Sequence, residues 1–158
     1  MSRLQQEIKQ NRAFASPEQE TFLNLVRSAG ALSAPFNQLF KDHELSLPQY
    51  NVLRILRGHD GVGLSCSQIS ERMVTRDSDI TRLVDRLVKG DLASRRRSES
   101  DRRVVLIGIT ARGRRLLADL EGPVTDAHKS TLGHLSAAEL AELNRLLVKA
   151  RSPESEDN

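Results

Sequence analysis

The chain has 158 residues, of which 38% are hydrophobic and 28% are charged, and its formal net charge at pH 7 is +3. This length suits one domain with a core of its own, and no apolar run is long enough to cross a bilayer. No charged-then-apolar leader opens the chain, so the sequence predicts a cytoplasmic protein without a membrane partner. The single cysteine, Cys66, cannot form an internal disulfide, which fits a reducing compartment.

The positive charge is concentrated in about one third of the sequence. Residues 72–115 contain thirteen Lys and Arg against six Asp and Glu, whereas the rest of the chain contains eleven against fifteen. A run of charges alone usually indicates a solvated surface. In the context of the motifs below, this run indicates a segment that meets a polyanion.

The first long helix is predicted over residues 17–41, after a polar lead-in at residues 1–12. Apolar residues recur there at spacings of three and four and form one face, which comprises Phe22, Leu25, Val26, Ala29, Leu32, Phe36, Leu39 and Phe40. Pro35 removes an amide donor inside this run, so we expect the helix to be kinked or split there. So large an apolar face on a terminal helix requires a partner that covers it.

Two further helices begin with the Ser-x-x-Gln spacing of a capping box. Ser46 and Gln49 open a helix that ends at a glycine-rich loop, residues 58–63. Its predicted buried face comprises Val52, Leu53, Ile55 and Leu56. Ser65 and Gln68 open a shorter helix to about residue 73, with Ile69 and Met73 predicted to be buried.

A third helix is predicted from about Asp77 to Lys89, after a turn at residues 75–77 in which Thr75 is the candidate N-cap. One face of this helix is apolar and is expected to lie against the core, with Ile80, Leu83, Val84 and Leu87. The opposite face is polar, with Thr81, Arg82, Asp85 and Arg86. Gly90 and Asp91 end the helix.

A short polar strand at 92–97, a tight turn at 98–101 and a β-branched run at 103–109 predict a β-hairpin. Thr110 then caps a helix from 111 to about 132, with a break expected near Gly122-Pro123. Ser136 and Glu139 open a last helix at 137–151, and the acidic tail at 152–158 is predicted to be disordered. The fold class is therefore mainly α with a small β-hairpin wing (α+β), in the order of a winged helix-turn-helix.

The second helix of such a motif enters the major groove of DNA, and the first helix braces it. The candidate contacts are Arg76, Asp77, Ser78, Asp79, Thr81, Arg82 and Arg86, together with Ser65 and Ser67 of the bracing helix. Arg76 suits a bidentate pair with guanine, whereas Arg82 and Arg86 suit backbone phosphates. Asp77 or Asp79 either accepts from a cytosine amino group or only caps the helix.

The hairpin is the second predicted contact with DNA. Five arginines fall within nine residues there, namely Arg95, Arg96, Arg97, Arg102 and Arg103. Arginine at the tip of a β-ribbon suits the narrow minor groove, where the negative potential is strongest. Asp101 is expected to hold a neighbouring arginine by a charge-assisted hydrogen bond. A solvated turn is the simpler alternative, which so dense a cluster beside a helix-turn-helix disfavours.

Three stretches, LSLPQYNVLRIL, ITRLVDRLVKGDL and RRRSESDRRVVLIGITARGRRLL, resemble the MarR family of bacterial transcription regulators. The most specific part is DRR at the hairpin tip, followed by an apolar strand and T-x-x-G. The chain departs from the family pattern at Asp91, where the family usually has glycine, and at Arg76-Asp77, where it usually has a capping residue and proline. Asp tolerates the left-handed conformation better than most residues, so the turn is expected to survive.

The resemblance implies a bacterial, nucleoid-associated homodimer that binds a pseudo-palindromic operator in double-stranded DNA. It implies one domain over residues 1–151, with a DNA-binding lobe at about 46–110 and dimerisation helices at about 12–42 and 111–151. Arg103, with Arg102 beside it, would enter the minor groove. Members of the family commonly repress genes, and they release DNA when a small aromatic or phenolic ligand binds between the dimer helices and the DNA-binding lobe.

A candidate pocket for such a ligand follows from the aromatic residues, which all lie in the first third of the chain. Its predicted lining comprises Phe22, Phe36, Phe40 and Tyr50. Core packing and dimer contacts are the simpler role for any single one of them.

Other chemistry has little support in the sequence. No Cys or His cluster has the spacing of zinc ligands, and no phosphate-binding loop or catalytic arrangement is present, so neither an enzyme nor a cofactor is predicted. Cys66 is expected to be a small buried residue at a helix start rather than a redox sensor. The main alternative function is a constitutive DNA-binding or architectural dimer without an effector. A helical protein-interaction module would leave the arginine-rich hairpin unexplained.

Overall fold

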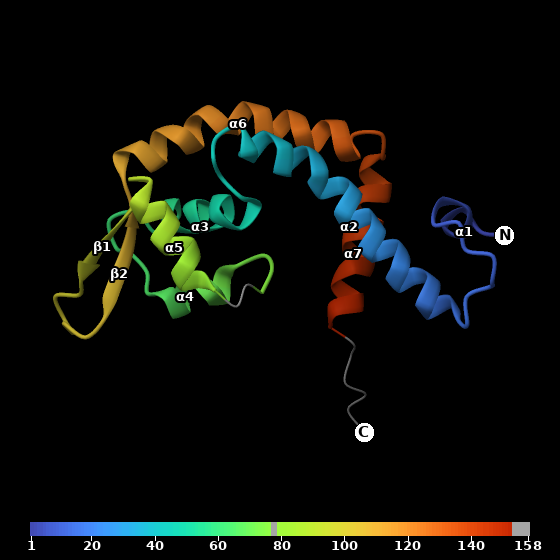
Figure 1. Cartoon of the computed structure of the whole chain (residues 1–158), viewed down its shortest axis with the longest axis horizontal. Helices are drawn as coiled ribbons and strands as arrows, with labels where there is room; N and C mark the ends of the chain where they lie inside the picture. The colour runs from blue at the N-terminus through green and yellow to red at the C-terminus, as the bar shows by residue number, and fades with distance from the viewer. Residues whose placement is uncertain (77–78, 153–158) are drawn as a thin grey trace, which may run out of the picture. The chain divides into compact units, whose positions relative to one another are not determined.

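The computed structural model describes residues 1–76 and 79–152. Its elements are α1 (Arg3–Glu7), α2 (Pro17–Lys41), α3 (Leu47–Arg57), α4 (Cys66–Arg72), α5 (Ile80–Lys89), β1 (Ala93–Arg97), β2 (Val105–Ile109), α6 (Ala111–Leu132) and α7 (Ala137–Arg151) (Figure 1). The predicted mainly helical class with one β-hairpin is therefore confirmed. Apart from Ser152, the tail predicted to be disordered lies outside the described residues.

The chain divides into two compact units, Met1–Glu121 and Gly122–Asn158. The first contains α1 to α5, the hairpin and the beginning of α6, and the second contains the rest of α6 and α7. The predicted division into a DNA-binding lobe and dimerisation helices stays a prediction. No helix in the described ranges is long and apolar enough to span a membrane.

Serine caps begin several of the helices, as the sequence spacing predicts. The boxes at Ser46, Ser65 and Ser136 are complete, because each serine accepts from the backbone N–H three residues later and the residue there accepts from the serine N–H. At the last box, Ser136 donates to the Glu139 carboxylate from its backbone N–H and from its hydroxyl, and these two bonds, the backbone one first, hold the pKa of Glu139 below its ordinary value. The predicted cap at Thr110 is also present, since the Gly113 N–H donates to its Oγ1 at 3.0 Å.

Both helices with an internal proline run without interruption. Pro35 lies inside α2 and Pro123 inside α6, so the break expected near Gly122-Pro123 is wrong. A proline removes a single backbone hydrogen bond, and the turns on either side retain theirs.

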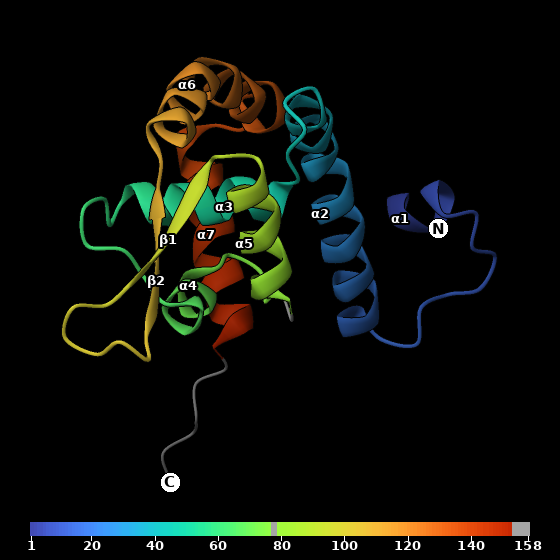
Figure 2. The ribbon, with the colours of Figure 1, turned by 60° about the vertical axis from the view of Figure 1, so that its left-hand side comes forward.

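The core of the first unit forms where α3, α5 and the hairpin meet (Figure 2). Its fully buried side chains include Val52, Leu53, Leu56, Ile69, Val84, Leu87 and Ile107. The predicted apolar face of α5 is buried as expected, whereas Ile55 and Met73 are only half-buried. Phe40 at the end of α2 stacks on Tyr50 of α3, with ring centroids 4.3 Å apart.

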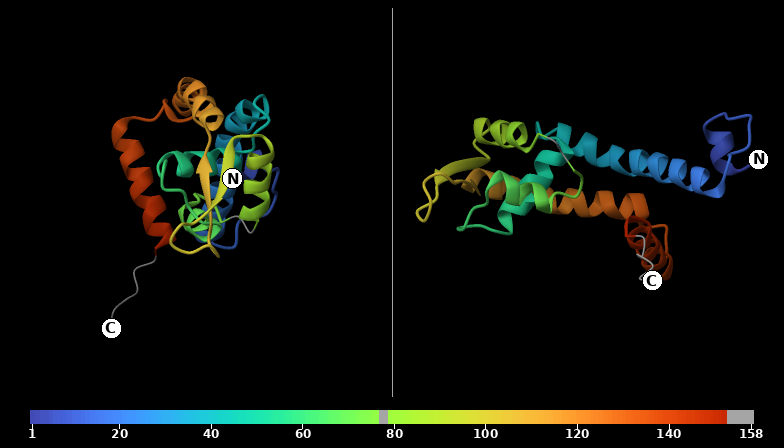
Figure 3. Two further views of the ribbon diagram at one scale, coloured as in Figure 1. Left: turned by 90° about the vertical axis from the view of Figure 1, so that its left-hand side faces the viewer. Right: turned by 90° about the horizontal axis from the view of Figure 1, so that it is seen from below.

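The hairpin is joined to this core at its base. β1 and β2 pair antiparallel, with Ala93 opposite Ile109 and Arg97 opposite Val105. Leu64, in the loop before α4, exchanges two backbone hydrogen bonds with Ile107 of β2, at 2.9 and 2.8 Å. These contacts fix the base of the hairpin against the lobe. The tip of the hairpin projects beyond the helices α3 to α5 (Figure 3).

Two residues, one just after α5 and one in the first turn of α6, restrict which side chains fit. Asp91 adopts the left-handed conformation with φ +56°, as the sequence comparison with the family pattern predicts. Gly113 packs so tightly that a Cβ there would lie 2.3 Å from the carbonyl oxygen of Leu92. This contact gives the physical reason for glycine in the T-x-x-G motif.

Candidate nucleic-acid interface

The helix predicted to read the major groove begins later than expected. α5 starts at Ile80, and Asp79 is its N-cap, accepting from the Arg82 N–H at 3.1 Å. The predicted start at Asp77 with Thr75 as the N-cap is therefore wrong. A short carboxylate accepts readily from the first free N–H groups of a helix, and here Asp79 takes that role. Asp77 and Ser78, both predicted DNA contacts, lie outside the described residues.

The outer face of α5 is free of core contacts. Thr81, Arg82, Asp85 and Arg86 are all exposed. The Arg82 guanidinium lies 3.5 Å from the Asp79 carboxylate, so the cap also holds this arginine near the helix start. Arg76 is exposed before the helix.

At the bracing helix α4, the two predicted serine contacts, the N-cap Ser65 and Ser67 within the helix, differ in exposure. Ser67 is exposed, whereas Ser65 is half-buried and its Oγ accepts from the Gln68 N–H. The Ser65 hydroxyl retains its proton for donation to a phosphate or a base.

The five arginines of the hairpin fall into two groups. Arg95 donates to the Asp85 carboxylate of α5, Arg96 donates to the carbonyl oxygen of Val62, and Arg97 donates across the hairpin to the carbonyl oxygen of Arg102. Arg102 and Arg103 are exposed at the tip, and neither guanidinium is bonded to any part of the chain that the structure describes. These two side chains are therefore the ones available to a ligand.

Asp101 supports the tip in a different way from the one predicted. Its Oδ1 accepts from the backbone N–H of Arg103 at 2.9 Å rather than from a guanidinium. A local turn bond of this kind is typical of aspartate two residues before its donor. It fixes the backbone of Arg103 and leaves the side chain unbonded.

Comparison with known proteins decides the family. The sequence profile of the MarR family matches residues 45–105. The HTH-type transcriptional regulator MgrA of Staphylococcus aureus is 31% identical over 113 residues, which cover 72% of this chain and 74% of MgrA. The chain belongs to the MarR family.

Solved structures agree with this assignment to the MarR family. The MarR transcription factor of Planctomyces limnophilus is 44% identical with a TM-score of 0.67, over 85% of this chain and 98% of that one. BpsR of Bordetella bronchiseptica is 26% identical with a TM-score of 0.77, over 90% of this chain and all of the other (100%). The protein is thus a winged-helix member of a family of transcriptional regulators, a class that is generally not enzymatic.

The four aromatic residues predicted to line a ligand pocket do not form one group in this MarR-family protein. Phe40 and Tyr50 are buried against each other, and the Phe36 ring lies 6.5 Å from that of Phe40. Phe22 is 63% exposed, fourteen residues before Phe36 on the same helix. Their assignment to a pocket stays a prediction.

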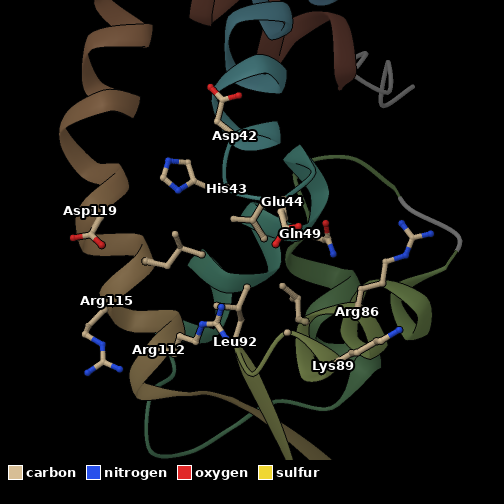
Figure 4. A pocket seen from close by; sticks show the side chains of 14 residues that line it. Asp42, His43, Glu44, Gln49, Arg86, Lys89, Leu92, Arg112, Arg115 and Asp119 are labelled. Atoms are coloured by element: carbon tan, nitrogen blue, oxygen red, sulfur yellow. The ribbon is translucent and has the colours of Figure 1, made fainter.

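A cleft of about 750 Å³ lies elsewhere in the first unit, between the end of α2, α3, α5 and α6 (Figure 4). Its lining includes four basic side chains, Arg86, Lys89, Arg112 and Arg115, and three acidic ones, Asp42, Glu44 and Asp119. In Figure 4, Asp119 lies on the α6 side of the cleft and Arg86 on the α5 side, and Arg112 and Leu92 lie between them. Within the described ranges these charges form no ion pair with one another, and Asp42 accepts a hydrogen bond from Gln38 at 3.3 Å. The four basic side chains are therefore available to a polar ligand.

Sequence reasoning missed this cleft because its residues come from four separate segments. Arg112 and Arg115 share a helix face at a spacing of three, which was the one signal in the sequence. Cys66 is half-buried rather than buried. No group of three His, Cys, Asp or Glu residues suited to a metal ion occurs among the described residues.

Proposed function

We propose that this protein is a sequence-specific regulator of transcription that binds double-stranded DNA as a homodimer. The observation that carries the proposal is the pairing of an exposed polar face on α5 with two unbonded arginines, Arg102 and Arg103, at the tip of the adjoining hairpin. A helix of this kind fits the major groove, and arginine at a ribbon tip fits the minor groove beside it. The operator is an inverted repeat with half-sites about one helical turn, roughly 34–36 Å, apart.

The exposed apolar side chains of two helices support the dimer. On α2, Phe22, Leu25 and Val26 are exposed, and α7 has no buried residue although Leu143, Leu146 and Val148 belong to it. Contiguous apolar residues on a protein surface mark sites of association. In this proposal the two helices bury these residues against a second copy of the chain.

DNA binding is tested with a duplex selected by the protein from random sequences. Arg103→Ala should weaken binding at least about fivefold, because one guanidinium leaves the minor groove. Arg145→Ala on α7 is the matched control, since it removes the same charge from an exposed site and should leave binding unchanged. An unchanged affinity of Arg103→Ala at physiological salt would contradict the wing contact.

The proposal extends to repression that a small ligand relieves. This part of the proposal is supported by BpsR, whose DNA binding is regulated by 6-hydroxynicotinic acid. The cleft between α2 and α6 is the site we favour, because its arginines suit a carboxylate and its leucines suit an apolar ring. The four aromatic residues are less suited to line a ligand site, because the rings of Phe40 and Tyr50 already stack on each other.

The ligand is tested with a panel of aromatic acids and phenols that begins with 6-hydroxynicotinic acid. An effector should raise the melting temperature of the free protein and lower its affinity for DNA, because it must prefer one of two conformations. Arg112→Ala should abolish both effects if the cleft is the site. A panel that changes neither quantity would leave the second candidate function, a constitutive DNA-binding dimer.

A further inference from the structure

The β-hairpin is fastened to the lobe from both of its faces by consecutive arginines. Successive residues of a strand point to opposite faces, so Arg95 and Arg96 leave β1 in opposite directions. Arg95 donates to Asp85 of α5 at 2.5 Å. Arg96 donates to the carbonyl oxygens of Val62 and Gly61 at 2.5 and 3.4 Å.

The carbonyl groups that receive Arg96 belong to a loop of defined geometry. Gly61 and Gly63 have φ values of +83° and +78°, which favour glycine. One residue later, Leu64 exchanges two backbone hydrogen bonds with Ile107 of β2. The same loop therefore holds both strands of the hairpin, one through its backbone and the other through a guanidinium.

The fastening ends before the tip. Beyond Arg96 the hydrogen bonds of the hairpin lie within the hairpin itself, in the part of the chain that the structure describes, such as that between Arg97 and the carbonyl oxygen of Arg102. The orientation of the tip relative to α5 therefore depends on contacts upstream of it, namely those of Arg95 and Arg96 and the backbone bonds between Leu64 and Ile107. The Asp85–Arg95 pair is partly exposed, with side chains 54% and 37% accessible, and such pairs add little to stability.

We propose that Asp85, Arg95 and Arg96 are positioning residues that set the angle between the hairpin and α5. They fix the distance between α5 and the hairpin tip. At this distance α5 occupies the major groove while Arg102 and Arg103 enter the adjacent minor groove. Arg95 also neutralises a carboxylate on the DNA-facing side of α5, which would otherwise repel phosphates. The inference rests on the proposed function, and it assigns Arg95 and Arg96 a role within the protein rather than on DNA.

A double-mutant cycle tests the positioning role on the selected duplex. In the wild-type background Arg103→Ala should weaken binding at least about fivefold. In the Asp85→Asn background the contact between the hairpin and α5 loses its charge attraction and keeps at most a neutral hydrogen bond, so the same substitution should have an effect at least about threefold smaller. Asp85→Asn alone should leave the melting temperature nearly unchanged, because the pair is partly exposed.

A matched control separates geometry from charge. Glu99→Gln removes one carboxylate from the turn of the same hairpin and should leave the effect of Arg103→Ala unchanged. The reversed pair, Asp85→Arg with Arg95→Asp, should restore that effect. Footprinting on the DNA adds a direct view. With Asp85→Asn, the minor groove at the flank of the binding site should lose its protection from hydroxyl-radical cleavage. Guanines in the major groove should stay protected from methylation.

The two possible failures are distinct. An equal effect of Arg103→Ala in the wild-type and Asp85→Asn backgrounds would overturn the positioning role and leave the proposed DNA contact intact. No effect of Arg103→Ala in the wild type would overturn the wing contact itself, and the inference with it.

Discussion

Asp79 performs two tasks that the sequence alone leaves open. Its Oδ1 caps α5, and its other carboxylate oxygen lies 3.5 Å from Arg82. The sequence pattern allowed Asp79 to be either a helix cap or an acceptor from a cytosine amino group. The same pattern placed the start of the helix two to three residues too early. Propensity could not resolve this, because Thr75, Asp77 and Asp79 are all acceptable N-caps and only packing decides among them.

Substitutions of Asp79 distinguish capping from base contact. Asp79→Ala should lower the free energy of unfolding by about 1 kcal/mol, because the N–H of Arg82 loses its acceptor. Asp79→Asn keeps an acceptor oxygen and should retain most of that stability, as chemical denaturation would measure.

The selected DNA sequence provides the second readout. If Asp79 only caps the helix, Asp79→Asn should bind the same sequence as the wild type. A changed preference at one base pair would show that the carboxylate also reads a base.

The arginines of the hairpin show how far residue types can be interpreted. Their number and position indicated a polyanion contact, but their individual partners did not follow from the sequence. The partners of Arg95 and Arg96 lie ten and about thirty-four residues away, on α5 and in the loop before α4. Long-range partners of this kind depend on the packing of the lobe, which a local pattern does not encode.

Among the elements, helix starts followed from the sequence better than helix interiors. All three capping boxes occur as predicted, since each depends on residues only three apart. The break at Gly122-Pro123 was wrong, because a proline disfavours a helix without forbidding it. The strand predicted over 103–109 begins at Val105, since the first two residues belong to the turn.

Two glycines of α6 offer a matched test of packing at the element scale. Gly113→Ala would place a Cβ 2.3 Å from the Leu92 carbonyl oxygen, so the backbone must shift. We expect a loss of about 1–3 kcal/mol in the free energy of unfolding. Gly122 has nothing within 4 Å of an added Cβ, so Gly122→Ala should stabilise α6 by about 0.5–1 kcal/mol.

Thermal or chemical denaturation of the two variants measures the contrast. A Gly113→Ala protein as stable as the wild type would mean that the junction between the hairpin and α6 is loosely packed. Both variants replace a glycine of α6 with alanine, so helix propensity does not explain a difference between their free energies of unfolding.

At the scale of the whole molecule, the sequence alone indicates an apolar face that needs a partner. The apolar stripe of α2 exceeds what one protomer buries, and Phe22 and Val26 remain 63% and 55% exposed. The cleft, by contrast, could not be predicted, because it collects charged residues from four segments whose proximity is a property of the tertiary structure.

The dimer is tested by a charge placed on that stripe. Phe22→Asp should weaken association at least about tenfold, because a carboxylate must be desolvated in an apolar contact. Sedimentation at several concentrations measures this. Val62→Asp is the control, since Val62 is also exposed but lies in the loop before α4.

The wild-type protein itself provides a second measurement. Its melting temperature should rise with protein concentration, as mass action requires of a folded dimer that dissociates on unfolding. A sedimenting monomer, with a melting temperature independent of concentration, would contradict the dimer and the paired half-sites of the operator.

The chain carries one thiol, at the first residue of α4, and that thiol is half-buried. A maleimide dye would therefore label each protomer once, on the lobe that we expect to meet DNA, without the removal of any other cysteine. Two identical fluorophores in a dimer exchange energy, and the resulting depolarisation depends on their separation. A single labelled preparation could thus follow self-association in real time.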